Sequence, residues 1–357
     1  MSAPTGGGAL ITVPVELGDR SYDVVVGPGA RHRLAQMVGP GVRQAVVVTQ
    51  PALVDQAARL DAGVPTEILT LPDGEVAKTP DTVAELCRSF ARRRLARSDL
   101  VVAVGGGVVT DVAGFAAAVY HRGTGYVNVA TTLLAQVDAA IGGKTGVNLA
   151  EGKNLMGAFW QPVGVLCDTD LLATLAPREW ACGRGEMAKY AFLSGSRPDA
   201  SILDLALAEQ VARCVRIKAE VVAADEREGD RRAVLNYGHT LGHALEGMAL
   251  DGGDLRHGEA VAIGLVFAAL LARRLGRIDD ERVELHRRVV AGFGLSADLP
   301  PGADPEVVVA YMARDKKAHH DLTFVLDGPT GVEPVPGVDP ADVLATLAEM
   351  STLEATA

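Results

Sequence analysis

The sequence is poor in aromatic residues, in cysteine and in positive charge. Aromatic side chains are 4% of the 357 residues, so alanine, valine, leucine and glycine must supply most of the core. The four cysteines show no Cys-x-x-Cys spacing, a pattern typical of reduced, buried thiols in a cytoplasmic protein. With 34 Lys and Arg against 45 Asp and Glu, the net charge of −11 disfavours nucleic acid as a partner. It does not exclude an anionic small molecule, because local charge decides that binding.

The sequence also lacks a hydrophobic run long enough to cross a bilayer. Its longest apolar stretch, Ala260–Ala272, is shorter than a membrane-spanning helix requires. Residues 1–8 are rich in Ser, Pro and Gly without a charged start, which predicts a loose tail rather than a targeting signal. Hydrophobic residues are 48% of the chain, so a large core can be buried. We therefore expect a globular cytoplasmic protein with no membrane partner.

The first half of the chain alternates short β-branched runs with helical patterns. Residues 101–104 are apolar at every position, as expected for a strand that is buried on both faces. Six segments have the composition of strands: Tyr22–Gly27, Gln44–Thr49, Thr66–Leu71, Leu100–Val104, Tyr126–Val129 and Val163–Cys167. Helical patterns such as Pro51–Leu60 and Thr79–Arg97 lie between several of them. This alternation predicts a Rossmann-like parallel sheet with helices on both faces.

The pattern changes close to Leu175. From residue 177 to residue 292 long helical patterns predominate, and a short β-like piece, Leu322–Leu326, follows near the end. The clearest helical patterns are Ser201–Ala224, Asn236–Met248 and His257–Leu275. We therefore expect an α/β domain of residues 1–175 and a mainly α-helical domain of residues 176–357. A cleft between two such domains is a common place for a small-molecule site.

A glycine-rich segment, Gly105–Gly114, follows the buried strand and opens a helix. Its three leading glycines allow the backbone to approach a phosphate closely, and the helix N-terminus favours an anion. The segment does not match Gly-x-Gly-x-x-Gly, so the standard Rossmann fingerprint is absent. A tight strand-to-helix turn without a ligand also fits the pattern.

Two further pieces offer groups that suit a nucleotide. Asp73-Gly-Glu75-x-x-Lys78 supplies carboxylates for ribose hydroxyls and an ammonium group, although a solvated turn has the same composition. Thr131 and Thr132 follow another strand, where a hydroxyl either meets a nucleotide or caps a helix. Neither piece decides the function alone.

Residues 136–154 gather polar side chains among glycines. Glycines bring the backbone close, lysines supply positive charge, and Asn and Asp fix hydroxyl groups, which together suit a polyhydroxylated phosphate ester. Gly143-Lys144-Thr is not a Walker motif, because Asp138 stands where that motif needs its first glycine. A solvated glycine and lysine loop remains an alternative. The chemistry-bearing residues of the segment are Asp138, Lys144, Asn148, Lys153 and Asn154.

A histidine pair indicates a metal site. His239 and His243 are four residues apart, so both lie on one helix face, and His257 begins another helical pattern. Glu186 lies upstream, and with the histidines it offers the nitrogen and oxygen donors of a catalytic zinc-type site. A histidine pair on a helix is by itself usually not a metal site, so Glu186 and His257 strengthen the hypothesis.

Together, the ordered motifs resemble the 3-dehydroquinate synthase family of the sugar phosphate cyclase superfamily, from about Val24 to Leu326. The resemblance rests on Asp-Gly-Glu-x-x-Lys, Gly-Gly-Gly-x-x-x-Asp-x-Ala-Gly-Phe, Tyr-x-Arg-Gly, Thr-Thr-Leu-Leu-Ala-Gln-x-Asp, Gly-Gly-Lys-Thr-Gly-x-Asn, Gly-Lys-Asn-Leu-x-Gly-Ala-Phe, Asn-Tyr-Gly-His-Thr-Leu-Gly-His-Ala and His-Gly-Glu-Ala-Val-Ala. It implies an NAD-binding α/β domain, a helical metal- and substrate-binding domain, and a homodimer.

The resemblance also implies a role for each matched position. The metal, Zn²⁺ or Co²⁺, would be held by Glu186, His239 and His257. NAD would be contacted by Asp73, Glu75, Lys78, Gly107, Asp111, Thr131, Thr132, Leu171 and Thr174, and also by Lys144 and Lys153. The sugar phosphate substrate would be surrounded by Asp138, Lys144, Asn154, Lys189, Lys218, Arg232, Asn236 and His243. Arg122 would reach the phosphate site of the neighbouring subunit, and one of Lys316 and Lys317 would face the phosphate.

The implied activity converts 3-deoxy-D-arabino-heptulosonate 7-phosphate to 3-dehydroquinate and phosphate, the second step of the shikimate pathway. An aminodehydroquinate synthase or another sugar phosphate cyclase is the nearest alternative. A metal-dependent polyol dehydrogenase would share the architecture but make a net redox change. A protein that only binds the ligand is disfavoured, because no expected metal ligand is missing from the sequence.

Overall fold

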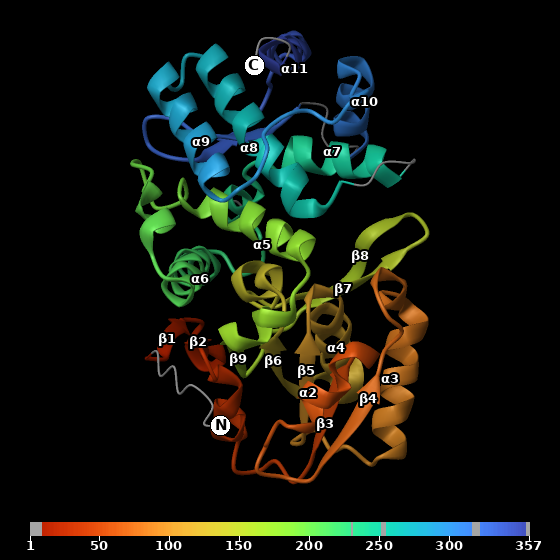
Figure 1. Ribbon diagram of the computed structural model, residues 1–357. Helices are drawn as coiled ribbons and strands as arrows, with labels where there is room; N and C mark the ends of the chain where they lie inside the picture. Colours follow the sequence, from red (N-terminus) through yellow and green to blue (C-terminus); the bar gives the residue numbers. More distant parts are fainter. Residues whose placement is uncertain (1–8, 230, 251–254, 316–321, 355–357) are drawn as a thin grey trace. The chain divides into compact units, whose positions relative to one another are not determined.

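The structure is a computed structural model that describes residues 9–229, 231–250, 255–315 and 322–354 (Figure 1). The chain forms two compact units. The first comprises Met1–Leu175 and Ala206–Arg227, and the second comprises Ala176–Leu205 and Glu228–Ala357. Among the described residues, no helix has both the length and the apolar character needed to cross a membrane.

A seven-stranded sheet forms the centre of the first unit, in the order β1-β2-β9-β6-β5-β3-β4. Across the sheet, the six strands β2, β9, β6, β5, β3 and β4 each run parallel to their neighbours. Only the edge strand β1 is antiparallel, and it pairs with β2. The strands are β1 (Ile11–Val15), β2 (Tyr22–Gly27), β3 (Ala45–Thr49), β4 (Thr66–Thr70), β5 (Leu100–Gly105), β6 (Gly125–Ala130) and β9 (Gly164–Asp168). The predicted α/β fold with a parallel sheet is confirmed.

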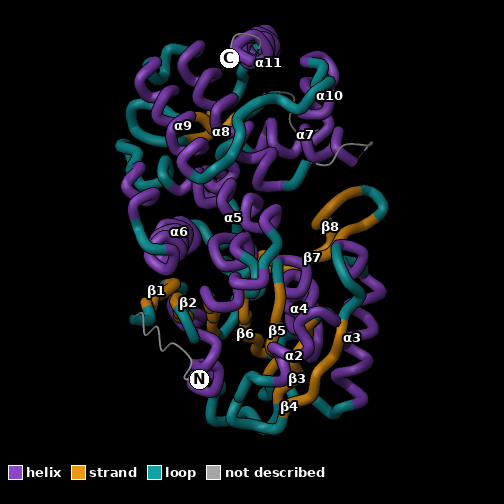
Figure 2. The backbone as a smooth tube through the Cα atoms, in the orientation of Figure 1, coloured by secondary structure: helices purple, strands orange, loops and turns teal. Residues whose placement is uncertain are grey.

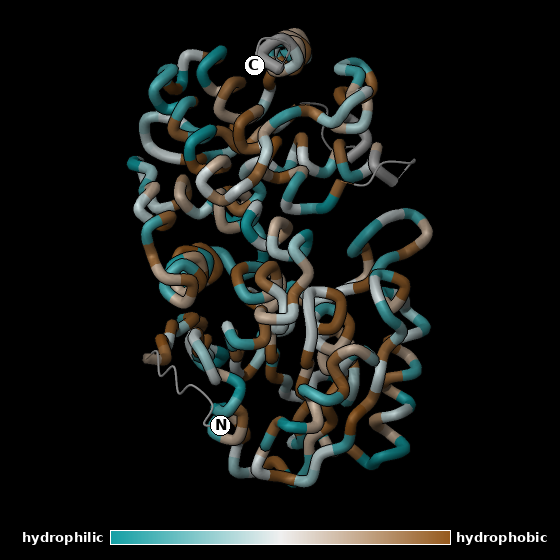
Figure 3. Tube along the Cα trace, in the orientation of Figure 1, coloured by the Kyte–Doolittle hydropathy of each residue, from teal (hydrophilic) through white to brown (hydrophobic). Residues whose placement is uncertain are grey.

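Helices cover both faces of the sheet, and alternate residues of β5 show why. Val101 and Ala103 belong to a core cluster with residues of α3 (Pro80–Arg92) and α4 (Gly107–Val119). Val102 and Val104 belong to a second cluster with residues of α1 (Leu34–Met37) and α2 (Val54–Ala58). Because side chains alternate across a strand, a strand buried on both faces needs this continuous apolar run. Hydrophobic residues accordingly run along the strands in Figure 3.

A β-hairpin in the first unit was not predicted. It consists of β7 (Lys144–Leu149) and β8 (Gly152–Phe159), which pair antiparallel. Most of β8 is exposed, and both strands are rich in glycine, lysine and asparagine. These residues have low strand propensity, so the segment resembles a polar loop in the sequence.

One helix belongs to a different unit from the one expected. The predicted second domain began at residue 176 and included α6 (Leu207–Ala224), but α6 packs on β1, β2 and the π-helical turn η6 (Ala135–Ala139) of the first unit. The physical reason is the apolar face of the helix, on which Val211, Val215 and Val222 are buried. Sequence periodicity finds such a face but does not reveal which surface covers it.

The second unit is mainly helical, as Figure 2 shows. Its longer helices are α5 (Pro177–Tyr190), α7 (His239–Leu250), α8 (His257–Arg274), α9 (Asp280–Gly292), α10 (Pro305–Asp315) and α11 (Pro340–Glu354). The apolar run predicted to be too short for a membrane lies in α8, which is buried along most of its length. The predicted β-like piece forms β10 (Phe324–Leu326), which pairs with β11 (Glu333–Val335).

Candidate active site

The glycine-rich turn between β5 and α4 is closely packed. A Cβ atom on Gly106 would lie 2.9 Å from Cγ2 of Thr132, and one on Gly105 would lie 2.4 Å from Cγ2 of Val109. Larger residues would therefore push the turn away from its neighbours. Because Gly107 is the first residue of α4, the turn presents a helix N-terminus at the carboxyl edge of the sheet, a position that favours an anion.

Other predicted cofactor residues lie at the same edge. Thr131 and Thr132 directly follow β6, and the Thr131 amide donates to the Gly105 carbonyl over 3.0 Å. Oγ1 of Thr132 accepts from the amide of Ala135 at 3.2 Å, so this hydroxyl serves as a cap in the structure. Leu171 and Thr174 lie in the short helix η7 (Thr169–Thr174), which follows β9. Parallel strands place their carboxyl ends together, and ligands of open α/β sheets bind there.

Lys78 joins three separate segments of the first unit. Its Nζ donates to Oδ2 of Asp111 at 2.7 Å and to Oδ1 of Asn154 at 2.6 Å. It also lies 4.0 Å from Oε1 of Glu75. Burial raises the pKa of Asp111 to about 6, although Lys78 works in the opposite direction. The structure thus brings together residues that the sequence assigned to the cofactor and one, Asn154, that it assigned to the substrate.

Asn148, to which the family resemblance gave no role, also belongs to this cluster. Its Nδ2 donates to Oε1 of Glu75 at 2.8 Å, and its Oδ1 accepts from the amide of Asn154 at 2.9 Å. Its own amide donates to the carbonyl of Lys78 at 2.9 Å. Asn154 has a φ of +56°, a left-handed conformation that asparagine tolerates. The Gly-x-Asn motif contained Asn148, but only the folded hairpin shows that both ends of its amide are used.

The predicted substrate residues of the first unit include one ion pair. Nζ of Lys218 on α6 lies 2.6 Å from Oδ1 of Asp138 in the π-helical turn and 2.7 Å from the Asp138 carbonyl. Lys218 is buried, so this pair ties α6 to the turn. Lys144 begins β7 and Lys153 lies on β8, and both residues are exposed.

Arg122 lies apart from the cofactor residues of its own chain. It follows the C-terminal end of α4, whereas Gly107 and Asp111 lie in the first turns of that helix. At about 1.5 Å per residue, the last residue of α4 lies roughly 18 Å from Gly107 and roughly 12 Å from Asp111 along the helix. Arg122 is exposed and has a φ of +62°. The structure therefore does not gather Arg122 with the other predicted residues of the first unit.

In the second unit, Glu186, His239 and His257 converge. Oε1 of Glu186 lies 3.2 Å from Nε2 of His239 and 3.0 Å from Nε2 of His257. One ligand atom from each residue lies within 4.8 Å of the other two. Glu186 is on α5, while His239 and His257 are the first residues of α7 and α8. Two imidazoles and one carboxylate form the donor set of catalytic zinc sites, so these residues fit Zn²⁺ or Co²⁺.

Hydrogen bonds fix the orientation of both imidazole rings. Nδ1 of His239 donates to the carbonyl of Tyr237 at 3.1 Å, which leaves Nε2 to face Glu186. Nδ1 of His257 lies 2.9 Å from Oε2 of Glu246, a residue that the sequence did not single out. Partners of this kind hold a metal-ligating ring in the required tautomer. Glu246 lies seven residues after His239, two helical turns along the same face, so helical spacing could have found it.

The charge states of the three residues suit metal binding. Burial would raise the pKa of Glu186, but Lys189 and His239 outweigh it and hold that pKa well below its usual range. Burial lowers the pKa of His239. Burial also opposes charge on His257, but hydrogen bonds with Glu186 and Glu246 raise its pKa to about 10. Glu186 is therefore an anion and His239 is neutral, and a divalent cation would displace the proton of His257.

Two glycines bring the metal-type cluster together. A Cβ atom on Gly185 would lie 1.9 Å from the carbonyl oxygen of Gly258, and one on Gly258 would lie 1.9 Å from that of Cys182. Only glycines allow α5 and α8 to approach so closely. Gly185 precedes Glu186 and Gly258 follows His257. The closest contact of the two helices therefore lies beside the two side chains that must meet.

Further predicted residues surround this cluster. Lys189 forms an ion pair with Glu186 and donates from Nζ to the carbonyl of Leu235 at 2.9 Å. The ring centroid of His243 is 5.4 Å from that of His239, and its side chain is exposed. Arg232 is buried and Asn236 is exposed, both in the short helix η9 (Arg231–Asn236). Lys316 and Lys317 lie outside the described residues.

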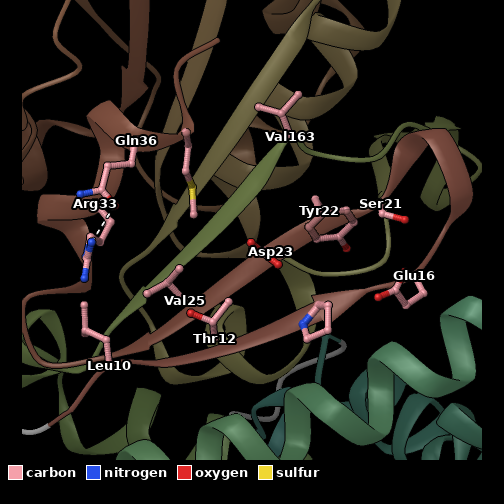
Figure 4. Close-up of a pocket in the computed structure, with 12 residues that line it drawn as sticks. Leu10, Thr12, Glu16, Ser21, Tyr22, Asp23, Val25, Arg33, Gln36 and Val163 are labelled. Atoms are coloured by element: carbon pink, nitrogen blue, oxygen red, sulfur yellow. Dashed lines mark hydrogen bonds between the residues drawn. The ribbon is translucent and has the colours of Figure 1, made fainter.

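A groove elsewhere in the first unit carries none of the predicted site residues (Figure 4). Its volume is about 610 Å³. Thr12 and Asp23 of β1 and β2 line one side, and Arg33 and Gln36 lie on the other, joined by a 2.7 Å hydrogen bond. Volume alone does not identify a site without convergent chemical groups. We therefore assign the chemistry to the two clusters above.

Replacement of Gly258 by alanine tests the contact between α5 and α8. The new methyl group must displace the carbonyl of Cys182, so we expect Gly258→Ala to destabilise the protein by about 1–3 kcal/mol or more. Gly41→Ala is the control, because nothing lies within 4 Å of a Cβ at that position. Chemical denaturation measures both changes. Equal stability of the two variants would contradict the close contact.

Comparisons with known proteins agree with this geometry. The family model described as "3-dehydroquinate synthase N-terminal" matches residues 68–182, and that described as "3-dehydroquinate synthase C-terminal" matches residues 183–318. A 3-dehydroquinate synthase from Nitrobacter hamburgensis is 44% identical over 352 residues, which cover 91% of this chain and 92% of the relative. A protein from Amycolatopsis mediterranei that is assigned as an aminodehydroquinate synthase is 54% identical over 335 residues, with 93% and 92% covered.

Solved structures give the same family relationship. A 2-deoxy-scyllo-inosose synthase complexed with carbaglucose-6-phosphate, NAD⁺ and Co²⁺ has a TM-score of 0.85, with 28% identity and 95% and 100% of the two chains covered. The 2-epi-5-epi-valiolone synthase ValA from Streptomyces hygroscopicus, with NAD⁺ and Zn²⁺ bound, has a TM-score of 0.80, with 30% identity and 95% and 99% covered. Taken with the family models and the curated relatives, these likenesses show that the chain belongs to the 3-dehydroquinate synthase family.

Proposed function

We propose that this protein converts 3-deoxy-D-arabino-heptulosonate 7-phosphate to 3-dehydroquinate and phosphate, as an NAD- and metal-dependent cyclase of the cytoplasm. The observation that carries the proposal is the convergence of Glu186, His239 and His257, with His243 one helical turn from His239. Such a centre suits a reaction in which a substrate hydroxyl must lose its proton near neutral pH.

Two cofactors serve this function. When bound, NAD⁺ accepts and returns a hydride, and Zn²⁺ or Co²⁺ polarises hydroxyl and carbonyl oxygens of the substrate. Glu186, His239 and His257 would hold the metal. The N-terminus of α4 at Gly107 would meet the pyrophosphate of NAD, and Glu75 would accept hydrogen bonds from ribose hydroxyls. The presence of NAD⁺ with Co²⁺ or Zn²⁺ in two related synthases supports this assignment.

The chain's own side chains bind the substrate and move protons. His243 is exposed beside the metal-type cluster, so its imidazole relays the hydroxyl proton to solvent. The substrate alcohol is oxidised transiently, phosphate is eliminated, the ketone is reduced again, and an intramolecular aldol reaction closes the ring. Cationic side chains offset the phosphate and carboxylate of the substrate. These are Lys144, Lys153, Lys189, Lys218, Arg232 and one of Lys316 and Lys317, and Asp138, Asn154 and Asn236 orient hydroxyl groups.

The protein acts as a homodimer in this proposal. Arg122 lies at the opposite end of α4 from the cofactor residues of its own chain, and it is exposed. A role at the phosphate site of a partner subunit would account for an arginine in that position.

An amino analogue of the substrate is the second candidate. The relative assigned as an aminodehydroquinate synthase is 54% identical, against 44% for the 3-dehydroquinate synthase from Nitrobacter hamburgensis. In this proposal both reactions share the phosphate elimination and the ring closure, so the metal and NAD residues do not distinguish them. The difference lies in one substituent of the substrate, and kcat/KM for the two substrates measures it directly.

An assay with catalytic amounts of NAD⁺ tests the reaction class. We expect one phosphate and one carbocycle per substrate consumed, with Co²⁺ or Zn²⁺ present and with no accumulation of NADH. The measurement follows phosphate release and NADH absorbance together, with the heptulosonate phosphate and its amino analogue in parallel. Stoichiometric NADH would instead indicate a polyol dehydrogenase, and a much larger kcat/KM for the amino compound would favour the second candidate.

Replacement of Glu186 tests the metal ligands. We expect Glu186→Gln to lose most of its bound Co²⁺ and at least about 100-fold in kcat, because the carboxylate is a ligand. Glu284→Gln, at an exposed position on α9, is the matched control. Metal content by elemental analysis and phosphate release give the two readouts. A Glu186→Gln protein that kept its metal would contradict the assignment.

Replacement of Asn148 by aspartate tests the cluster around Lys78. The variant keeps an acceptor for the Asn154 amide, but it loses the donor to Glu75 and places two carboxylates side by side. We expect NAD⁺ binding to weaken roughly 3- to 10-fold, the equivalent of one hydrogen bond. Calorimetric titration measures this change, and Asn148→Ala should also disturb the conformation of Asn154. If the NAD⁺ affinity of Asn148→Asp were unchanged, Asn148 would not position Glu75 for the ribose of NAD.

A further inference from the structure

The second unit contains a buried polar pair, Tyr237 and His286, to which the proposed reaction gives no role. The hydroxyl of Tyr237 lies 2.7 Å from Nε2 of His286, and both side chains are fully buried. We propose that this pair positions the carbonyl of Tyr237, which in turn orients the metal ligand His239. This inference rests on the proposed metal site and adds two positioning residues to it.

The direction of each hydrogen bond in the pair is determined by its partners. Nδ1 of His286 lies 2.8 Å from the carbonyl of Arg282, and a carbonyl only accepts, so Nδ1 carries a proton. Burial lowers the pKa of His286 to about 4, so the ring is neutral and Nε2 has a lone pair. The Tyr237 hydroxyl must therefore donate to Nε2.

The His286 ring is itself held in place by its surroundings. Phe192 stacks on it with ring centroids 3.7 Å apart and planes inclined by 5°. The carboxylate of Asp327 lies 4.0 Å from Nε2 of His286 and is buried, with Arg282 bound to both of its oxygens at 2.7 and 3.2 Å. Arg282 also supplies the carbonyl that accepts from Nδ1. Tyr237 is thus anchored to a rigid polar core and not to a mobile side chain.

The backbone between Tyr237 and His239 transmits this position to the metal ligand. Gly238 has a φ of +81°, and a Cβ on Gly264 of α8 would lie 1.9 Å from the Gly238 carbonyl, so the turn is clamped against α8. The Tyr237 carbonyl accepts from Nδ1 of His239, which leaves Nε2 directed at Glu186. If the Tyr237 side chain moves, its carbonyl moves with it, and the imidazole of His239 loses its alignment.

Metal affinity distinguishes this positioning role from a purely structural one. If the pair only supported the fold, its replacement would lower stability and leave metal affinity unchanged. If the pair positions His239, its replacement also weakens metal binding in protein that remains folded. Tyr237→Phe removes only the hydroxyl, and His286→Leu removes both hydrogen bonds of the ring. His286→Gln restores a donor for the Arg282 carbonyl and an acceptor for Tyr237, so it serves as the rescue variant.

The control must lower stability without touching the metal-type cluster. Leu347 is fully buried on α11, a helix that contacts the far end of α8 through the 3.1 Å bond between Arg274 and Thr346. Leu347→Ala removes buried apolar contacts, so we expect it to lower the melting temperature. Its metal affinity should stay at the level of the unaltered protein.

The experiment is a Co²⁺ titration of the full-length metal-free proteins, well below their melting temperatures, followed by the visible absorption of the bound ion. We expect Tyr237→Phe and His286→Leu to weaken Co²⁺ binding about 10-fold or more and to alter the spectrum, with His286→Gln close to the unaltered protein. The inference is overturned if Tyr237→Phe and His286→Leu are less stable yet bind Co²⁺ with unchanged affinity and spectrum. It is equally overturned if Leu347→Ala loses as much affinity. Absence of Co²⁺ binding by the unaltered protein would refute the proposed metal site, and this inference with it.

Discussion

The close contact of α5 with α8 is the constraint on which the metal-type cluster depends. Gly185 and Gly258 allow the two backbones to meet where no Cβ atom fits, and each glycine is next to a residue of the cluster, Glu186 or His257. Helix packing thereby fixes the positions of the Glu186 and His257 side chains, because protein interiors are close-packed and resist small shifts. The buried carboxylate of Glu186 is then stabilised by the cation of Lys189, so packing and charge reinforce each other.

Buried lysines in this acidic protein are paired with carboxylates. The protein carries a net charge of −11, yet several of its cations are buried against carboxylates: Lys78 with Asp111, Lys218 with Asp138, and Lys189 with Glu186. Such pairs hold long side chains in one conformation, so in the proposed function a substrate anion would meet oriented donors that need little reorganisation. A net negative charge is therefore compatible with the cationic substrate contacts of the proposed function.

The two units contribute different chemistry to the proposed reaction. The first offers a helix N-terminus, threonines and a polar cluster at the carboxyl edge of a parallel sheet, which is where dinucleotides bind in such folds. The second offers nitrogen and oxygen donors with supporting groups behind each imidazole. In the proposed function, both candidate substrates would meet the same metal and NAD residues, so the choice between them must depend on few contacts. This explains why the two candidate substrates are difficult to separate by sequence.

The sequence by itself determined the parallel sheet, the helical second half, the family and the three metal-type residues, because hydrophobic periodicity and ordered motifs are local properties of the chain. It did not reveal the β7–β8 hairpin, whose exposed glycines, lysines and asparagines resemble a loop, or the unit to which α6 belongs, since an amphipathic helix does not specify its partner. The hydrogen bonds of Asn148 and Glu246, and the pairing of Tyr237 with His286, emerged only from the tertiary structure. Their roles consist of hydrogen bonds across long sequence separations, and only folding brings those atoms within 3 Å of one another.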